Sequence, residues 1–167
     1  MMDAAELHFR FAYFCLDAKC HVDPGNEPKF RKLQRDYLDN GTYPTAQEQD
    51  EIFKDSAKRR KAYASRINLD PWSPKLIALY WLVEHTRVIE QGEGDYALLS
   101  PEKRENCKVH IAQVIKRNQT TYLVKYDKTQ IEVDSSILPD ANQGDFIAIH
   151  RKGAVVNEKT LLSFLIS

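Results

Sequence analysis

Hydrophobic residues in the first ninety positions recur every three or four residues, which is the spacing of one face of an α-helix. This pattern predicts four helices, which begin near Asp3, Pro28, Thr45 and Ser73, and the last of them runs to Ile89. The glycines at positions 92 and 94 end the pattern, and a charged stretch follows over residues 93–106. We therefore expect a helical domain at residues 1–98 and a connector after it.

Local signals support two of these helix starts. Thr45 and Glu48 have the spacing of a capping box, and Ser73 before Pro74 suits an N-cap followed by the first helical position. The helix that Thr45 opens is expected to continue without a break to Tyr63. The helix that starts with Pro28 should direct four apolar side chains inward: Phe30, Leu33, Tyr37 and Leu38.

After residue 106 the apolar positions alternate with polar ones, which is the period of a β-strand. Five short runs of this kind fall within about fifty residues, at 109–114, 122–126, 131–133, 146–149 and 154–156. So few short strands bury a core most economically as a small closed or half-open barrel. Asn157 is a candidate N-cap for a last helix that carries Leu161 and Phe164.

Charge and hydropathy narrow the class of protein. The chain has 24 Lys and Arg against 24 Asp and Glu, so its net charge is zero. A neutral chain lacks the positive electrostatic field of a protein that binds nucleic acid mainly through charge.

No apolar run approaches the length of a membrane-spanning helix, and the N-terminus lacks the pattern of a signal peptide. Three cysteines fit no disulfide framework. We expect a soluble, cytoplasmic protein with reduced thiols and no membrane partner.

The N-terminal helix and the residues after it contain several potential metal ligands. These are His8, Cys15, Cys20 and His21. Their spacing is not that of a strong paired zinc signature, and Cys15 shares a helix face with Phe11. A metal site therefore stays open beside the alternative of ordinary buried or surface thiols, and no cofactor is expected.

The motifs of common enzymes are missing from the sequence. It has no Gly-x-Ser-x-Gly elbow, no phosphate-binding loop and no Gly-x-Gly-x-x-Gly motif. His85 follows Glu84 on the most apolar helix, where a structural histidine is the usual role. We therefore expect no enzymatic activity. An enzyme would need a cleft that contains Glu84, His85 or His150.

Nucleic-acid binding through the small barrel is an alternative. The candidate residues are Lys116, Arg117, Tyr122, Lys125 and Tyr126, which would combine aromatic stacking with a basic groove if they face solvent. Residues 106–167 contain eight basic and six acidic side chains, a surplus of two basic ones. Because alternating Tyr and Val residues also describe a barrel interior, both interpretations remain.

Four segments of the C-terminal third resemble the HypC/HupF family of nickel-iron hydrogenase maturation chaperones. They are Cys107–Ala112, Ile137–Asp140, Gly144–His150 and Gly153–Val156. In that family a Cys-led start, a Leu-Pro, a Gly-Asp before alternating apolar residues and His, and a Gly-x-Ala build a small OB-like barrel before a short helix. The family cysteine directly follows the initiator Met, whereas a helical domain precedes Cys107 here.

The resemblance implies a non-enzymatic accessory or binding protein, a hydrogenase-maturation-type chaperone. Its protein client would be a hydrogenase subunit or a maturation factor. The residues that the resemblance implies for client binding are Cys107, His110 and His150.

The whole chain is also similar to a bacterial family in which a helical domain precedes a HypC-like barrel. This similarity is carried by the barrel together with three segments of the helical part: Leu7–Tyr13, Leu69–Pro74 and Ala78–Leu82.

Taken together, these observations predict an α+β fold, with an N-terminal helical bundle at residues 1–98. A small OB-like β-barrel with a short C-terminal helix follows at residues 107–167.

Overall fold

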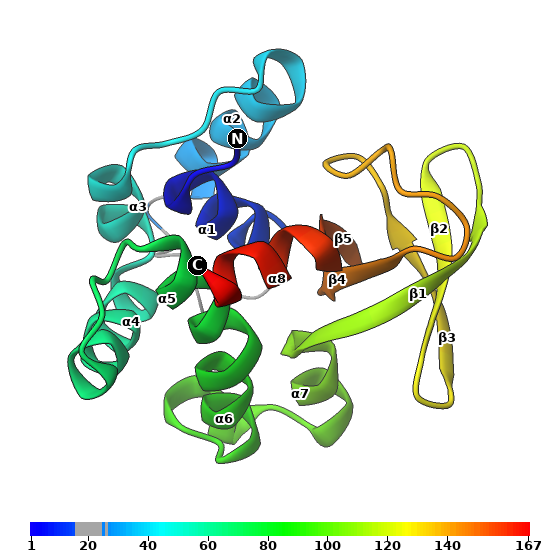
Figure 1. The fold of residues 1–167 in the computed structure, drawn as a ribbon. Helices are drawn as coiled ribbons and strands as arrows, with labels where there is room; N and C mark the ends of the chain where they lie inside the picture. The colour runs from blue at the N-terminus through cyan, green and yellow to red at the C-terminus, as the bar shows by residue number, and fades with distance from the viewer. Residues whose placement is uncertain (16–24, 26) are drawn as a thin grey trace. The chain divides into compact units, whose positions relative to one another are not determined.

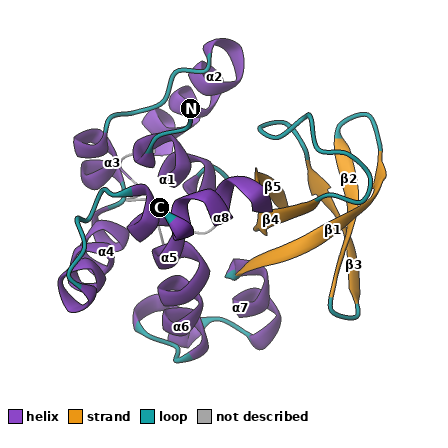
Figure 2. Cartoon of the chain, viewed as in Figure 1, coloured by secondary structure: helices purple, strands orange, loops and turns teal. Residues whose placement is uncertain are grey.

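The structure is a computed structural model that describes residues 1–15, 25 and 27–167 (Figure 1). These residues form two compact units, Met1–Glu84 and His85–Ser167. The five strands all belong to the second unit, and the elements of the first unit are helices (Figure 2). The chain is therefore α+β. None of the helices in this described part is long and apolar enough to cross a membrane.

The first unit contains α1 (Ala4–Ala12), α2 (Glu27–Asn40), α3 (Ala46–Ile52), α4 (Lys54–Ile67), α5 (Pro74–Leu79) and the π-helical segment η3 (Tyr80–Glu84). Three of the predicted helix starts are confirmed, because the side chains of Asp3, Thr45 and Ser73 each accept a backbone hydrogen bond from the first helical turn. The capping box of Thr45 and Glu48 is complete. Each cap satisfies a backbone donor that the helix itself cannot use.

The prediction of one unbroken helix after Thr45 is wrong. The backbone leaves the helical region at Phe53 (φ −105°, ψ 54°), so α3 ends there and α4 begins at the next residue. Phe53 is buried, with its ring 5.4 Å from that of Phe30 in an edge-to-face arrangement. In α2, Leu38 is 50% exposed, whereas Tyr37 next to it is buried as predicted.

The apolar helix after Ser73 continues past the boundary of the first unit. Its middle turn is the π-helical η3, and the helix then becomes α6 (His85–Glu90) of the second unit. The sequence pattern places the domain boundary later, in the connector at residues 93–106.

That connector is itself structured. It forms the 3-10 helix η4 (Gly94–Leu98) and α7 (Pro101–Cys107), which Ser100 caps. The other elements of the second unit are β1 (Val109–Arg117), β2 (Thr121–Tyr126), β3 (Thr129–Asp134), β4 (Phe146–His150), β5 (Gly153–Asn157) and α8 (Glu158–Ile166). Asn157 is the N-cap residue of α8 as predicted, but its side chain makes no capping hydrogen bond.

The five strands pair in the order β1-β2-β3-β5-β4, and β4 pairs with β1, so the circuit of strands closes. Four of the pairings are antiparallel. The fifth joins β3 to β5 in parallel at Asp134 and Gly153. A bulge in β1 between Val114 and Lys116 places two residues opposite Leu123 of β2. α8 packs on β4 and β5 (Figure 1).

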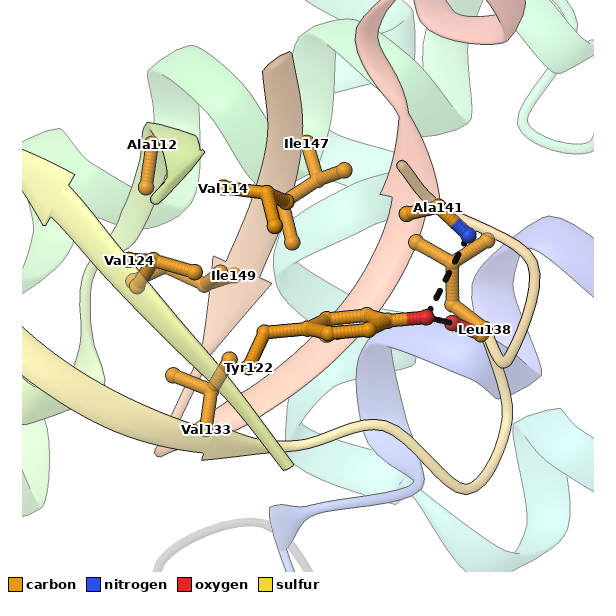
Figure 3. Packing of buried hydrophobic residues seen from close by; sticks show 10 residues of the cluster. Ala112, Val114, Tyr122, Val124, Val133, Leu138, Ala141, Ile147 and Ile149 are labelled. Carbon is orange, nitrogen blue, oxygen red and sulfur yellow. Dashed lines mark hydrogen bonds between the residues drawn. The ribbon is translucent and has the colours of Figure 1, made fainter. Parts of the chain in front are cut away.

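Tyr122 lies at the centre of the sheet's core (Figure 3). Its side chain is buried, and its hydroxyl donates a hydrogen bond to the Leu138 carbonyl at 2.5 Å and accepts one from the Ala141 amide at 3.2 Å. The segment between β3 and β4 that contains these two residues forms no strand. The tyrosine therefore satisfies the backbone of this segment and holds it over the core.

Replacing Tyr122 with Phe should destabilise the second unit. The Tyr122→Phe variant keeps the ring but leaves the Leu138 carbonyl and the Ala141 amide without their partner inside the core. The expected loss is about 1–3 kcal/mol in the free energy of unfolding, measured by urea denaturation. Tyr126→Phe is the matched control, because Tyr126 is only half-buried. Equal losses in the two variants would contradict this role for Tyr122.

Candidate functional site

The main candidate site surrounds Cys107 in the second unit. Cys107 is the last residue of α7, and its side chain is 2% exposed. His150, at the end of β4, is fully buried, and its Nε2 lies 3.1 Å from the Cys107 carbonyl oxygen. The structure therefore brings together two of the three residues that the resemblance implies for client binding, and it places both below the surface.

His85 of α6 joins this cluster. Its Nε2 lies 3.0 Å from the same Cys107 carbonyl, and its ring is 5.4 Å from that of His150 in an edge-to-face arrangement. A carbonyl oxygen can only accept hydrogen bonds, so Nε2 must carry the hydrogen in both histidines. The two rings thus fasten the end of α7 to α6 and to β4.

The Cys107 thiol has a charged neighbour in Arg151, whose Nη1 donates a hydrogen bond to Sγ at 2.9 Å. Arg151 and Lys152 form the turn between β4 and β5, and both have positive φ angles, of 50° and 64°. Residues other than glycine adopt this conformation at some energetic cost. Here it directs the arginine back to the cysteine.

His110, the third implied residue, lies apart from this cluster. It is half-buried in β1, and its ring stacks on that of Tyr126 at a centroid distance of 4.1 Å. Its Nε2 lies 3.2 Å from the Glu105 carboxylate. His110 therefore takes part in a side-chain contact of its own, between β1, β2 and α7.

The candidates for nucleic-acid binding divide between two sides of the sheet. Lys116, Arg117 and Lys125 are exposed, whereas Tyr122 is buried in the core and cannot stack on a base. Tyr126 is half-buried, with one face of its ring against His110. The nucleic-acid alternative requires both tyrosines to face solvent, and Tyr122 does not meet this condition, because its position along β2 alternates into the core.

A second polar cluster, which the sequence pattern does not reveal, lies inside the first unit. His8 of α1 is fully buried, with Nδ1 2.7 Å from Oε1 of Gln49 and Nε2 3.2 Å from Nη1 of Arg60. Arg60 is fully buried too, pairs with Asp50 and stacks over the Trp72 ring at 4.0 Å.

The hydrogen-bond partners fix the protonation of this chain of groups. The Gln49 amide nitrogen donates to the carbonyls of Ala5 and Pro44, so its oxygen faces His8. Nδ1 of His8 then carries the hydrogen, and Nε2 accepts from Arg60. Burial is the main cause that lowers the pKa of His8, and the positive charge of Arg60 is the second; together they bring it to about 3. Burial raises the pKa of Asp50, but hydrogen bonds from Lys61 and Arg60 lower it overall.

The possible metal ligands near the N-terminus do not converge in the described residues. Cys15 is buried, and its thiol lies 4.0 Å from the Phe11 carbonyl. Cys20 and His21 lie outside the described residues. Among residues 1–15, 25 and 27–167, no group of three or more His, Cys, Asp or Glu side chains is placed to hold a metal ion.

The chain was compared with protein-family models, with curated proteins and with solved structures, and none of the three comparisons finds a match.

The sequence pattern does not single out Arg151, Gln49 or Arg60 as site residues. Gln49 and Arg60 each lie more than forty residues from His8, and the two positive-φ residues of the turn that aims Arg151 at Cys107 are not glycines. One signal was available: a histidine on the otherwise apolar inner face of α1 requires buried partners.

Stability should depend on pH through His8. The unfolded chain takes up a proton near the ordinary pKa of 6.5, whereas the folded chain resists protonation until about pH 3. The unfolded state therefore binds more protons in this window, and stability is lost as pH falls through it. Between about pH 7.5 and pH 5 this one group should remove about 2 kcal/mol from the free energy of unfolding.

The measurement is urea denaturation at several pH values for the natural chain and for His8→Gln. The variant cannot titrate at this position, so its stability should fall less over the same range. Parallel pH profiles of the two proteins would show that His8 does not carry the effect.

Proposed function

We propose that this protein is a non-enzymatic binding protein, in which the closed five-stranded sheet is an OB-like barrel and the helices of the first unit are a bundle. The strand order β1-β2-β3-β5-β4, with a parallel contact between β3 and β5, supports this assignment of the barrel.

The observation that carries the proposal is the mixed character of the outer face of β1 and β2. Ile111 and Leu123 are only half-buried on this face, and the exposed Lys116 and Lys125 lie beside Leu123. Gln113 pairs with Lys125 across the two strands. In this proposal the two aliphatic side chains form the centre of a contact with another protein, and the lysines form its polar rim. We call this set of five residues the outer face.

The resemblance to the HypC/HupF chaperones supports a protein client, and a hydrogenase subunit or a maturation factor is the class to test first. In this proposal Cys107 and His150 act by position. Their hydrogen bonds hold the start of β1 against the end of β4 and thereby support the outer face. The resemblance alone would instead place the Cys107 thiol in contact with the client.

Client capture should depend on the outer face. Tagged protein would be purified under anaerobic conditions from its native host, and the proteins recovered with it would be identified by mass spectrometry. We expect Leu123→Ser and Lys125→Glu each to reduce the recovered client at least about fivefold, since a central contact residue contributes about 1 kcal/mol or more. Lys128→Glu is the matched control, because Lys128 is an exposed lysine of the neighbouring turn. Undiminished capture by both outer-face variants would contradict the proposal.

The same experiment separates the two roles of Cys107. If the cysteine acts by position, Cys107→Ser should retain the client, because the backbone carbonyl that binds the two histidines remains. Loss of the client from a folded Cys107→Ser protein would place the thiol in the contact with the client.

Nucleic acid in the eluate without a client protein would favour the alternative function, in which Lys116 and Lys125 contact phosphates. The binding of nucleic acid should then weaken steeply as the salt concentration rises.

A further inference from the structure

One side of the backbone of β3 is mostly unpaired. β2 pairs with all six residues of β3, whereas β5 pairs with β3 only at Asp134, which lies opposite Gly153. The Asp134 amide donates a hydrogen bond of 2.8 Å to the turn between β4 and β5, so the backbone groups of Asp134 face away from β2. Because backbone groups alternate in direction along a strand, those of Gln130 and Glu132 also face away from β2.

These outward groups are open to a partner. The amides and carbonyls of Gln130 and Glu132 have no hydrogen-bond partner among the residues that the structure describes, and both residues are exposed. The facing strand does not offer a similar edge, because the residues 154–156 of β5 are buried. Figure 1 shows the turn end of the hairpin of β2 and β3 apart from β5 and α8. We call the outward amides and carbonyls of these two residues the β3 edge.

The β3 edge has few of the features that protect exposed strands from pairing. Such features include proline, lysine and bulges on the edge strand. The strand Thr129–Asp134 contains no proline and no lysine, and its pairing with β2 runs without a bulge. Three of its six residues are β-branched, which favours the extended backbone. A regular, extended and unpaired edge is the structure to which another chain can add a strand.

The β3 edge is continuous with the outer face. Leu123 of the outer face lies opposite Glu132 across the two strands. Lys125 lies opposite Gln130 in the same way. Opposed residues of an antiparallel pair point to the same side of a sheet. A strand added at the β3 edge would therefore place every second side chain beside the outer face.

The side chains of β3 indicate which residues an added strand must carry. The charged residues of β3, Glu132 and Asp134, are both acidic, so pairing with a second copy of β3 would bring like charges together. A basic residue opposite Glu132 would instead be attracted to it. On the other side of the sheet, Ile131 packs on the core but is only half-buried, so an apolar residue beside it would cover it.

We propose that the client protein adds an extended strand antiparallel to β3, with a lysine or arginine opposite Glu132 and an apolar residue beside Ile131. The backbone of this strand would form hydrogen bonds with the two amides and the two carbonyls of the β3 edge. The antiparallel direction gives the more stable pairing. This inference rests on the proposed client-binding function, and it specifies the conformation and the sequence pattern of the client segment.

The test uses the full chain labelled with ¹⁵N and the blocked peptide acetyl-Val-Lys-Val-Thr-amide. In the antiparallel register its lysine lies opposite Glu132 and its threonine opposite Gln130. The peptide should shift the amide signals of both residues to saturation and slow the exchange of these amides with solvent. A peptide with glutamate in place of the lysine should bind at least about threefold more weakly. Equal affinities for the two peptides, or no binding of the lysine peptide, would overturn the inference.

Methylated peptides test the backbone contact itself. Methylation of the lysine amide nitrogen removes a donor that faces β3, and the peptide should then bind at least about tenfold more weakly. Methylation of the following valine nitrogen is the matched control, because that amide faces away from β3 and its loss should change the affinity less than about threefold. Equal losses, or a larger loss from the valine methylation, would show that the peptide does not pair with β3 in this way.

A pair of variants at one position tests the protein side. Gln130→Pro removes an amide of the β3 edge that β2 does not use, a place where an edge strand accepts proline. We expect it to reduce the affinity for the lysine peptide at least about tenfold. Gln130→Ala keeps the amide and should bind normally. If Gln130→Pro does not fold, the methylated peptides decide the question with the natural chain.

The remaining outcomes separate this inference from other occupants and from the proposed function. A dimer of the natural chain in sedimentation analysis that Gln130→Pro abolishes would assign the β3 edge to a second copy and overturn the inference. If the outer-face variants lose the client but the lysine peptide does not bind, strand addition fails and client binding stands. If the peptide binds as expected while the outer-face variants capture the client normally, the β3 edge stands and the outer face fails as the client surface.

Discussion

The hydrogen-bond chain from Gln49 through His8 to Arg60 is the constraint on which the first unit depends. Each group fixes the orientation or the protonation of the next one. Two backbone carbonyls orient the Gln49 amide, and the amide oxygen then fixes the hydrogen of His8 on Nδ1. Nε2 of the neutral imidazole therefore accepts a hydrogen bond from Arg60. Arg60 then needs the Asp50 carboxylate, because a fully buried guanidinium without a counter-charge is strongly unfavourable. This chain of hydrogen bonds thus links α1, α3 and α4.

The second unit solves a similar problem with backbone acceptors. The Cys107 carbonyl lies at the end of α7, where a helix leaves its last carbonyls without internal partners, and His85 and His150 supply the missing donors. Tyr122 does the same for the non-strand segment before β4. In both places a side chain distant in the sequence provides the hydrogen bonds that the backbone does not obtain from its own helix or from a neighbouring strand.

Local patterns predicted most of the elements, and long-range contacts account for the failures. The caps at Asp3, Thr45 and Ser73 depend on neighbours within four residues, so the sequence shows them directly. The break at Phe53 depends on where a ring is buried in the tertiary core, and helix propensity does not contain that information. For the site, the pairing of Cys107 with His150 spans 43 residues, and alternation in β2 shows only that Tyr122 points inward or outward, not which.

The distribution of the reactive groups argues for binding rather than chemistry as the proposal to test first. Nε2 of His85 and Nε2 of His150 both lie against the Cys107 carbonyl. The two ring nitrogens of His8 lie against Gln49 and Arg60. These nitrogen atoms therefore take part in hydrogen bonds that hold the fold. Catalysis by them would have to break the bonds that position them. The side chains open to a partner are of another kind, namely the lysines and the half-buried aliphatic side chains of the outer face. Such groups recognise charge and shape, and they can do so without disturbing either buried network.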